Sequence, residues 1–308
     1  MRIAVLMSGQ QRYLEQSSKW WRERCFPDFH KNIEVDYFLH LWDDGTDLQQ
    51  QYDKVWSLYN PKHVVISKYQ DVIEDHIGKI KIRNNELQNT KYGPNWHIVP
   101  EYVQHTVCYQ GGEISQYTYN FPGMFLATAK TAESFELYFK EYDIAIKTRT
   151  DCLLNPMPEH HWGNLFGNML RQPAFNDTIF TPWLRIRNGL PFFGDLCFIG
   201  KSHLMQKFMT DMDKHLVKLA TDDKHLLSDF MIDPEIPFAH WLWSRLSMYS
   251  RTDWLSINVV WPTPFDSCLI RSDEDISDKK FEYLSNLYNS HEEKKHDHMF
   301  HKVGASKN

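Results

Sequence analysis

The segment Tyr142-Asp-Ile-Ala-Ile-Lys-Thr-Arg-Thr-Asp151 decides the fold that the sequence predicts. Its apolar part, residues 144–146, has polar residues on both sides and predicts a short buried β-strand. Lys147, Arg149 and Asp151 follow at every second position, so their side chains point to one face of an extended chain. The segment therefore predicts two cations and one carboxylate at the carboxyl end of a strand, where open α/β sheets bind their ligands.

Two interpretations of this cluster are open on the segment alone. The cations suit the oxygens of a diphosphate, and Asp151 could hold a divalent cation beside it. Alternatively, the three side chains form a salt bridge at the end of a strand with no ligand.

The chain before this segment predicts two βα units followed by a third strand. Strands are expected at 3–7, 35–40 and 64–66, with helices from the Ser-Gly turn to about residue 25 and over residues 48–58. This order is typical of a mostly parallel central sheet flanked by helices, which we predict as a Rossmann-like α/β fold in a single large domain.

The remaining elements are expected to complete that domain. Loops and a short helix are predicted over residues 69–122, a helix over 124–139, and loops over 157–190. A strand over 191–200 precedes a helix that Ser202 caps. A helix opening at Asp233-Pro-Glu235, a strand over 257–260 and a charged tail from about residue 273 follow.

Composition narrows the class of protein. The chain has 308 residues, 42% of them hydrophobic and 24% charged, which is ordinary for a soluble globular protein. A net charge of -6 disfavours wrapping a nucleic-acid backbone, which requires a basic face. The five cysteines are widely spaced without a CxxC motif, and no stretch reaches the ~20 apolar residues of a membrane span. We therefore expect a reducing, cytoplasmic location without a transmembrane segment.

The turn after the first predicted strand is a candidate anion site. Ser8, Gly9, Gln10 and Arg12 lie where a strand passes into a helix, a junction that presents backbone N–H groups to anions. Gly9 permits close approach of a ligand to the backbone, and Arg12 adds a positive charge. The alternative is a plain βα turn in which Ser8 caps the helix.

A second polar cluster follows the second predicted strand. Asp43 and Asp44 could hydrogen-bond a nucleobase or a ribose. Either could instead cap the helix over residues 48–58. His40, at the end of the strand, is interpreted as a structural residue.

Taken in order, these segments resemble a known group of enzymes. The segments are Ile3-Ala-Val-Leu-Met-Ser-Gly-Gln-Gln-Arg12, Val35-Asp-Tyr-Phe-Leu-His-Leu-Trp-Asp43, the 142–151 segment, Gly194-Asp195 and Pro234-Glu235. The set is similar to nucleotide-sugar glycosyltransferases of bacterial lipopolysaccharide and capsule synthesis, the WavE-like enzymes, and to their phage or viral relatives. The resemblance spans roughly residues 1–245 and implies a GT-A-like fold.

The resemblance also implies that different parts of the chain bind the donor and the acceptor. Residues 1–155 would bind the nucleotide sugar, residues 156–272 would form the acceptor-binding half of the same domain, and residues 273–308 are the tail. Asp151 would take the last position of a DxD-type motif and meet Mn²⁺ or Mg²⁺ on the donor diphosphate. The first carboxylate position of that motif holds Arg149. The donor-binding residues that we predict are Ser8, Gly9, Gln10, Arg12, Asp43, Asp44, Lys147 and Arg149.

The predicted activity is transfer of a sugar from a nucleotide-sugar donor to a glycan acceptor of the lipopolysaccharide or capsule type. An inverting enzyme needs a carboxylate base for the acceptor hydroxyl, and Asp195 and Glu235 are the candidates. A retaining enzyme would need no such base. Two alternatives are a phage-type enzyme that glycosylates modified DNA bases, which the net charge disfavours, and a catalytically inactive nucleotide-sugar or glycan binder, which Arg149 favours.

Overall fold

The computed structural model describes part of the chain. The described residues are 1–27, 31–87, 109–110, 113–114, 121–154, 159–176, 178–181, 184–187, 190–193, 197–210, 212–214, 217, 256–259 and 267–269. The predicted helix after Asp233 and the charged tail lie outside them.

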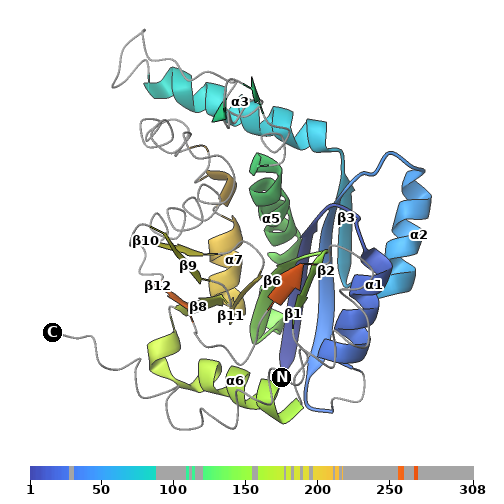
Figure 1. The fold of residues 1–308 in the computed structure, drawn as a ribbon, viewed down its shortest axis with the longest axis vertical. Helices are drawn as coiled ribbons and strands as arrows, with labels where there is room; N and C mark the ends of the chain where they lie inside the picture. Colours follow the sequence, from blue (N-terminus) through green and yellow to red (C-terminus); the bar gives the residue numbers. More distant parts are fainter. Residues whose placement is uncertain are drawn as a thin grey trace, which may run out of the picture.

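Seven of the described strands form one central sheet, in the order β12-β8-β11-β6-β1-β2-β3 (Figure 1). Strand β11 is antiparallel to both of its neighbours, and every other pairing in this sheet is parallel. The predicted α/β fold with a mostly parallel central sheet in one domain is confirmed. The seven strands are β1 (Arg2–Gly9), β2 (Glu34–Trp42), β3 (His63–Ser67), β6 (Ile144–Arg149), β8 (Thr178–Thr181), β11 (Cys197–Lys201) and β12 (Ser256–Val259).

Helices cover both faces of this sheet (Figure 1). One face carries α5 and α7, with the start of α3 packed against the same core, and the other carries α1, α2 and α6. The helices are α1 (Leu14–Trp20), which continues as a π-helix (Trp21–Cys25), α2 (Leu48–Tyr59), α3 (Tyr69–Leu87), α5 (Phe121–Phe135), α6 (Glu159–Arg171) and α7 (Ser202–Thr210). Short 3₁₀ turns lie at Phe139–Glu141 and Pro173–Phe175. No helix among the described residues is both long and apolar enough to cross a membrane.

Strand β1 is apolar on both sides because both of its faces are covered. Ile3, Val5 and Met7 enter the core beneath α1 and α6, while Ala4 and Leu6 enter the core beneath α5. All five side chains are fully buried. A continuous apolar run of this kind is what a parallel strand between two helical layers requires.

Strand β6 lies directly beside β1 and repeats its pattern. Ile144 and Ile146 join the α6 side, and Ala145 joins the α5 side. Their parallel register places Arg149 opposite Ser8, and the register of β1 with β2 places Ser8 opposite His40. The ends of three strands that are distant in sequence therefore meet at one edge of the sheet.

Two regions differ from their predicted structure. The region over residues 69–122, predicted as loops and a short helix, begins with the 19-residue helix α3, whose early residues Val72, Ile73 and His76 are buried. Helix α6 occupies part of the expected loop region over 157–190. Trp162, Phe166 and Met169 line its buried face, and their spacing of four and three residues is the period of an amphipathic helix.

The predicted strand over residues 191–200 is wrong as a single element. Its first part is β10 (Leu190–Phe193), which pairs with β9 (Leu184–Arg187) in a separate antiparallel sheet. Its second part is β11 in the central sheet. Helix α7 starts at Ser202 as predicted, but the Ser202 hydroxyl donates a hydrogen bond to the carbonyl of Tyr142 at 2.6 Å, which ties α7 to the start of β6.

Four short strands complete the described structure. Strand β7 (Cys152–Leu154) follows Asp151 and pairs with β13 (Ser267–Leu269). Strands β4 (Tyr109–Gln110) and β5 (Glu113–Ile114) pair with each other. The strand predicted over residues 257–260 is confirmed as β12.

Gly123 sets how closely the first turns of α5 and α3 approach. A Cβ atom on Gly123 would clash with Cε2 of Tyr69, and the Tyr69 ring packs edge-on against Trp42, with 5.2 Å between the ring centres. We expect Gly123→Ala to lower the free energy of unfolding by about 1–3 kcal/mol through overpacking.

Gly78 in α3 is the matched control, because nothing lies within 4 Å of a Cβ atom at that position. Gly78→Ala should raise the free energy of unfolding by about 0.5–1 kcal/mol, the usual gain from replacing glycine within a helix. Urea unfolding of both variants tests the contact, and equal effects of the same sign would contradict it.

Candidate functional site

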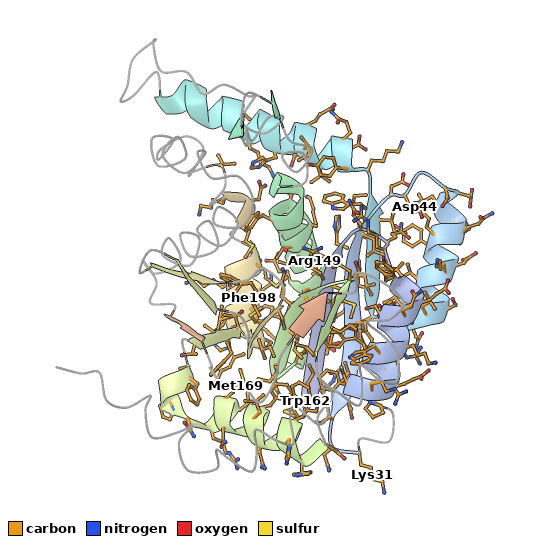
Figure 2. All side chains as sticks on the ribbon, in the orientation of Figure 1. Lys31, Asp44, Arg149, Trp162, Met169 and Phe198 are labelled. Atoms are coloured by element: carbon orange, nitrogen blue, oxygen red, sulfur yellow. The ribbon has the colours of Figure 1, made fainter. Side chains whose placement is uncertain are left out.

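The carboxyl ends of β1, β2, β3 and β6 lie next to one another and form the edge at which we place the candidate site. These strands end at Gly9, Trp42, Ser67 and Arg149. Parallel strands that end together in an open α/β sheet define the usual ligand position of such folds. In Figure 2, Arg149 lies near α5 at one end of the central strands, and Asp44 lies toward α2.

An ion pair between Arg149 and Asp151 occupies the end of β6. Arg149 Nε donates to Asp151 Oδ1 and Nη2 donates to Asp151 Oδ2, both at 2.8 Å. Such a fork of two hydrogen bonds fixes the plane of the guanidinium as well as its position. The Arg149 side chain is 30% exposed and that of Asp151 only 10%. The pair therefore presents its cation outward and keeps its carboxylate behind.

The turn that carries Asp151 is attached to the end of β1. The buried hydroxyl of Thr150 donates a hydrogen bond to the carbonyl of Gln10 at 2.6 Å. Gly9 has a φ of +130°, a conformation that favours glycine. The contact between Thr150 and Gln10 joins two of the predicted site segments directly.

Gln51 connects the end of β1 with the end of β2, although the sequence did not indicate it. Its buried side chain donates to Asp43 Oδ1 at 2.8 Å and to the carbonyl of Thr46 at 3.0 Å. Its Oε1 accepts a hydrogen bond from Gln11 Nε2, which also donates to the carbonyl of Trp42 at 3.1 Å. These contacts hold the loops after β1 and β2 in one arrangement.

Asp43 and Asp44 shape their own loop and do not cap helix α2. Asp43 Oδ1 accepts the N–H of Gly45, and Asp44 Oδ1 accepts the N–H of Thr46, each at 2.9 Å. The cap of α2 is Asp47, which accepts the N–H of Gln50, so the capping alternative for Asp43 and Asp44 is wrong. Hydrogen bonds from Gln51 and from the Gly45 backbone hold the pKa of Asp43 below its usual value.

A polar layer lies just below this edge, on the side that α5 covers. The hydroxyls of Ser8 and Thr128 are 3.3 Å apart, and His40 Nε2 lies 3.0 Å from Ser67 Oγ. His40 is fully buried, as its interpretation as a structural residue implies. Its burial, and secondarily the charge of Lys130, lower the pKa of His40 to about 4.

Ser8 does not cap helix α1. The residue at the start of α1 is Tyr13, in a left-handed conformation and without a side-chain cap, while Ser8 is buried against Thr128. The capping alternative for Ser8 is therefore wrong. Arg12 is exposed in the turn before α1, where its charge faces solvent.

Lys147 lies deeper than the sequence suggested. It is on the same face of β6 as Arg149, but its side chain is fully buried, with Nζ 5.7 Å from the centre of the Phe198 ring. Its expected place at the open edge is therefore not observed, and its role in donor binding stays a prediction. Asp195 and Glu235 lie outside the described residues.

The metal site that the resemblance implies does not fit the side chains at this edge. Both carboxylate oxygens of Asp151 accept hydrogen bonds from Arg149. Within the described part of the chain, no three His, Cys, Asp or Glu side chains are grouped as a metal site needs. Divalent metal binding therefore stays an untested expectation, and we assign no ligand set.

Comparisons with known proteins show similarity in structure but not in sequence. No protein-family model matches the chain, and no curated protein matches its sequence. Mouse xyloside xylosyltransferase 1, solved in its apo form, is similar in structure with a TM-score of 0.40 and 10% identity, over 83% of this chain and 84% of that one. A similarity of this degree carries no argument, so the functional proposal rests on the residues at the edge.

The buried His40 predicts a pH dependence of stability. In the unfolded chain His40 takes up a proton below pH 6.5, while in the folded protein it stays neutral down to about pH 4. The unfolded state therefore binds more protons between these values, and stability falls as the pH falls through this window. We expect His40→Gln to remove up to about 3 kcal/mol of the loss between pH 7 and pH 4.

Urea unfolding at both pH values measures this difference. Ser67→Ala is the control, because it removes the hydroxyl partner and keeps the titrating ring, so its pH dependence should match that of the unmodified protein. Identical pH dependence in the His40→Gln variant would contradict the assignment.

Proposed function

We propose that this protein is a glycosyltransferase that binds a nucleotide-sugar donor at the carboxyl edge of β1, β2 and β6. One observation carries the proposal. Three of the segments that resemble nucleotide-sugar glycosyltransferases end side by side at this edge, namely residues 3–12, 35–43 and 142–151. Thr150 contacts Gln10 there across 140 residues of sequence. Their polar groups come together through the Thr150 and Gln51 hydrogen bonds.

The donor would lie across these loops. We place its nucleoside toward the Asp43 and Asp44 loop, where carboxylate and backbone groups can hydrogen-bond a base or ribose. Its diphosphate would lie toward Arg149, with Ser8, Gly9, Gln10 and Arg12 on the neighbouring turn. Residues 1–155 then form the donor half of the domain, and residues 156–272 form the acceptor half.

The chemistry follows from where charge develops. Departure of the sugar passes through an oxocarbenium-like transition state, and negative charge builds on the diphosphate that leaves. A guanidinium already held in place stabilises that charge most strongly in the transition state. If the reaction inverts configuration, Asp195 or Glu235 would accept the proton of the acceptor hydroxyl. Asp195 stands two residues before Cys197, the first residue of β11.

A protein that binds nucleotide sugars without transferring them is the second candidate. Arg149 at the first position of the DxD-type motif favours it. Glycosylation of modified DNA bases is the third, and the net charge of -6 weighs against it. A glycan acceptor of the lipopolysaccharide or capsule type remains the preferred substrate class.

Release of nucleotide from a panel of UDP-, GDP- and CMP-sugars separates these candidates. We expect slow release from one donor, accelerated by an oligosaccharide acceptor more than by DNA with hydroxymethylated bases. Binding of a donor without release under any condition would favour the inactive binder. Acceleration by the modified DNA alone would favour the third candidate.

Asp151→Ala tests whether the ion pair at the end of β6 is part of the site for sugar transfer. Without its carboxylate partner the Arg149 guanidinium loses its fixed orientation, and we expect transfer to fall roughly 100-fold, as small misplacements of catalytic groups typically cause. Glu34→Ala is the matched control, since Glu34 starts β2 at the opposite edge of the sheet with a 77% exposed side chain. Unchanged turnover in Asp151→Ala, with the control also active, would remove Asp151 from the site.

A further inference from the structure

We infer that the guanidinium of Arg149, and not a divalent metal ion, is the cation that binds the donor's diphosphate, and that Asp151 positions this guanidinium. The inference rests on the proposed function and specifies how its donor is held. It assigns to Asp151 a role different from the metal ligand that the resemblance implies.

The carboxylate of Asp151 is already engaged. Each of its oxygens lies 2.8 Å from a different nitrogen of Arg149, and the side chain is largely buried behind its partner. A metal ion on Asp151 would compete with these hydrogen bonds for the carboxylate and place a double positive charge beside a guanidinium that never deprotonates. The arrangement thus opposes metal binding at the one carboxylate assigned to that task.

Asp43 and Asp44, the acidic side chains that the structure describes in the loop after β2, also form hydrogen bonds. Asp43 accepts hydrogen bonds from Gln51 and from the Gly45 backbone, and Asp44 accepts two from Thr46. Mg²⁺ and Mn²⁺ require oxygen ligands around a small ion, commonly one or two carboxylates beside substrate phosphates and water. Oδ1 of each carboxylate is instead used to shape the loop.

Arg149 has the properties that the diphosphate requires. Guanidinium groups match the spacing of phosphate oxygens and donate in a fixed plane. The side chain is three times more exposed than that of Asp151, and the turn that carries Asp151 is tied to β1 through Thr150 and Gln10. The cation is therefore held from behind and presented at the edge.

Because the ion pair has no net charge, Asp151 also competes with the diphosphate for Arg149. This produces opposite expectations for two variants. Asp151→Asn keeps one acceptor oxygen for the guanidinium and removes the competing negative charge, so diphosphate binding should stay equal or become tighter. If Asp151 were instead a metal ligand, Asp151→Asn would weaken diphosphate binding. Arg149→Gln should weaken diphosphate binding. If a metal ion bound the diphosphate instead, the same variant would remove the repulsion between the guanidinium and the metal and would strengthen binding.

Calorimetric titration with UDP and with GDP, in EDTA and in Mn²⁺, tests the inference. We expect one of the two nucleotides to bind the unmodified protein with dissociation constants that differ by no more than about twofold between EDTA and Mn²⁺. Arg149→Gln should weaken that binding roughly 10- to 100-fold. The affinity of Arg149→Lys should lie between those of the unmodified protein and Arg149→Gln, because lysine keeps the positive charge but cannot donate two parallel hydrogen bonds. Thermal unfolding of each variant shows whether it is folded, and the comparison of EDTA with Mn²⁺ needs no variant.

The outcomes separate the inference from the proposed function. Binding more than about tenfold tighter in Mn²⁺, and lost in Asp151→Asn, would overturn the inference and leave a nucleotide-sugar enzyme. No binding of either nucleotide in either buffer would overturn both. Metal-independent binding that Arg149→Gln leaves unchanged would overturn the inference alone.

Discussion

The parallel register of β1 with its two neighbours is the constraint on which the candidate site depends. Backbone pairing sets Ser8 opposite Arg149 on one side and opposite His40 on the other. Since β1 is buried on both faces, a slip of one residue would exchange its two sets of apolar side chains between the two cores. The packing that stabilises the sheet therefore also determines which polar groups meet at its edge.

The loops beyond that edge are held by side chains that are themselves buried. Gln51 is almost fully buried and forms hydrogen bonds with residues from the ends of β1 and β2. Thr150, which follows β6, is also buried and donates a hydrogen bond to Gln10 after β1. Buried polar groups are costly unless paired, so these contacts favour one loop arrangement. A rigid frame of this kind would place Arg149 where the charge of a departing diphosphate develops.

Much of the fold could be predicted because it follows from local patterns. The apolar runs of β1, β2 and β6 and the period of α2 and α5 are visible in the sequence. Helix α6 has an equally regular buried face, Trp162, Phe166 and Met169, but the loop prediction took no account of it. Asn188-Gly189, between β9 and β10 in the sequence, is a typical two-residue hairpin signal. The prediction missed it, because it assigned the residues of β9 to a loop and those of β10 to a longer strand.

The chemistry of the site was less predictable because it depends on tertiary contacts. Alternation placed Lys147 and Arg149 on one face, as observed, but could not show that Phe198 and its neighbours bury Lys147. Nor could it show that the chain turns after Arg149, so that Asp151 folds back onto the guanidinium. Gln51 lies in a helix 40 residues from its partner Gln11, so the hydrogen bond between them cannot be read from the sequence.

A crystal structure with UDP or GDP bound, grown without divalent metal, would show whether Arg149 binds the diphosphate. We expect the diphosphate to lie at the ends of β1 and β6, with its oxygens within hydrogen-bonding distance of the Arg149 guanidinium and with Asp151 still paired to Arg149. A diphosphate bound elsewhere, or one that binds only with a metal ion on Asp151 and Arg149 turned away, would contradict this expectation.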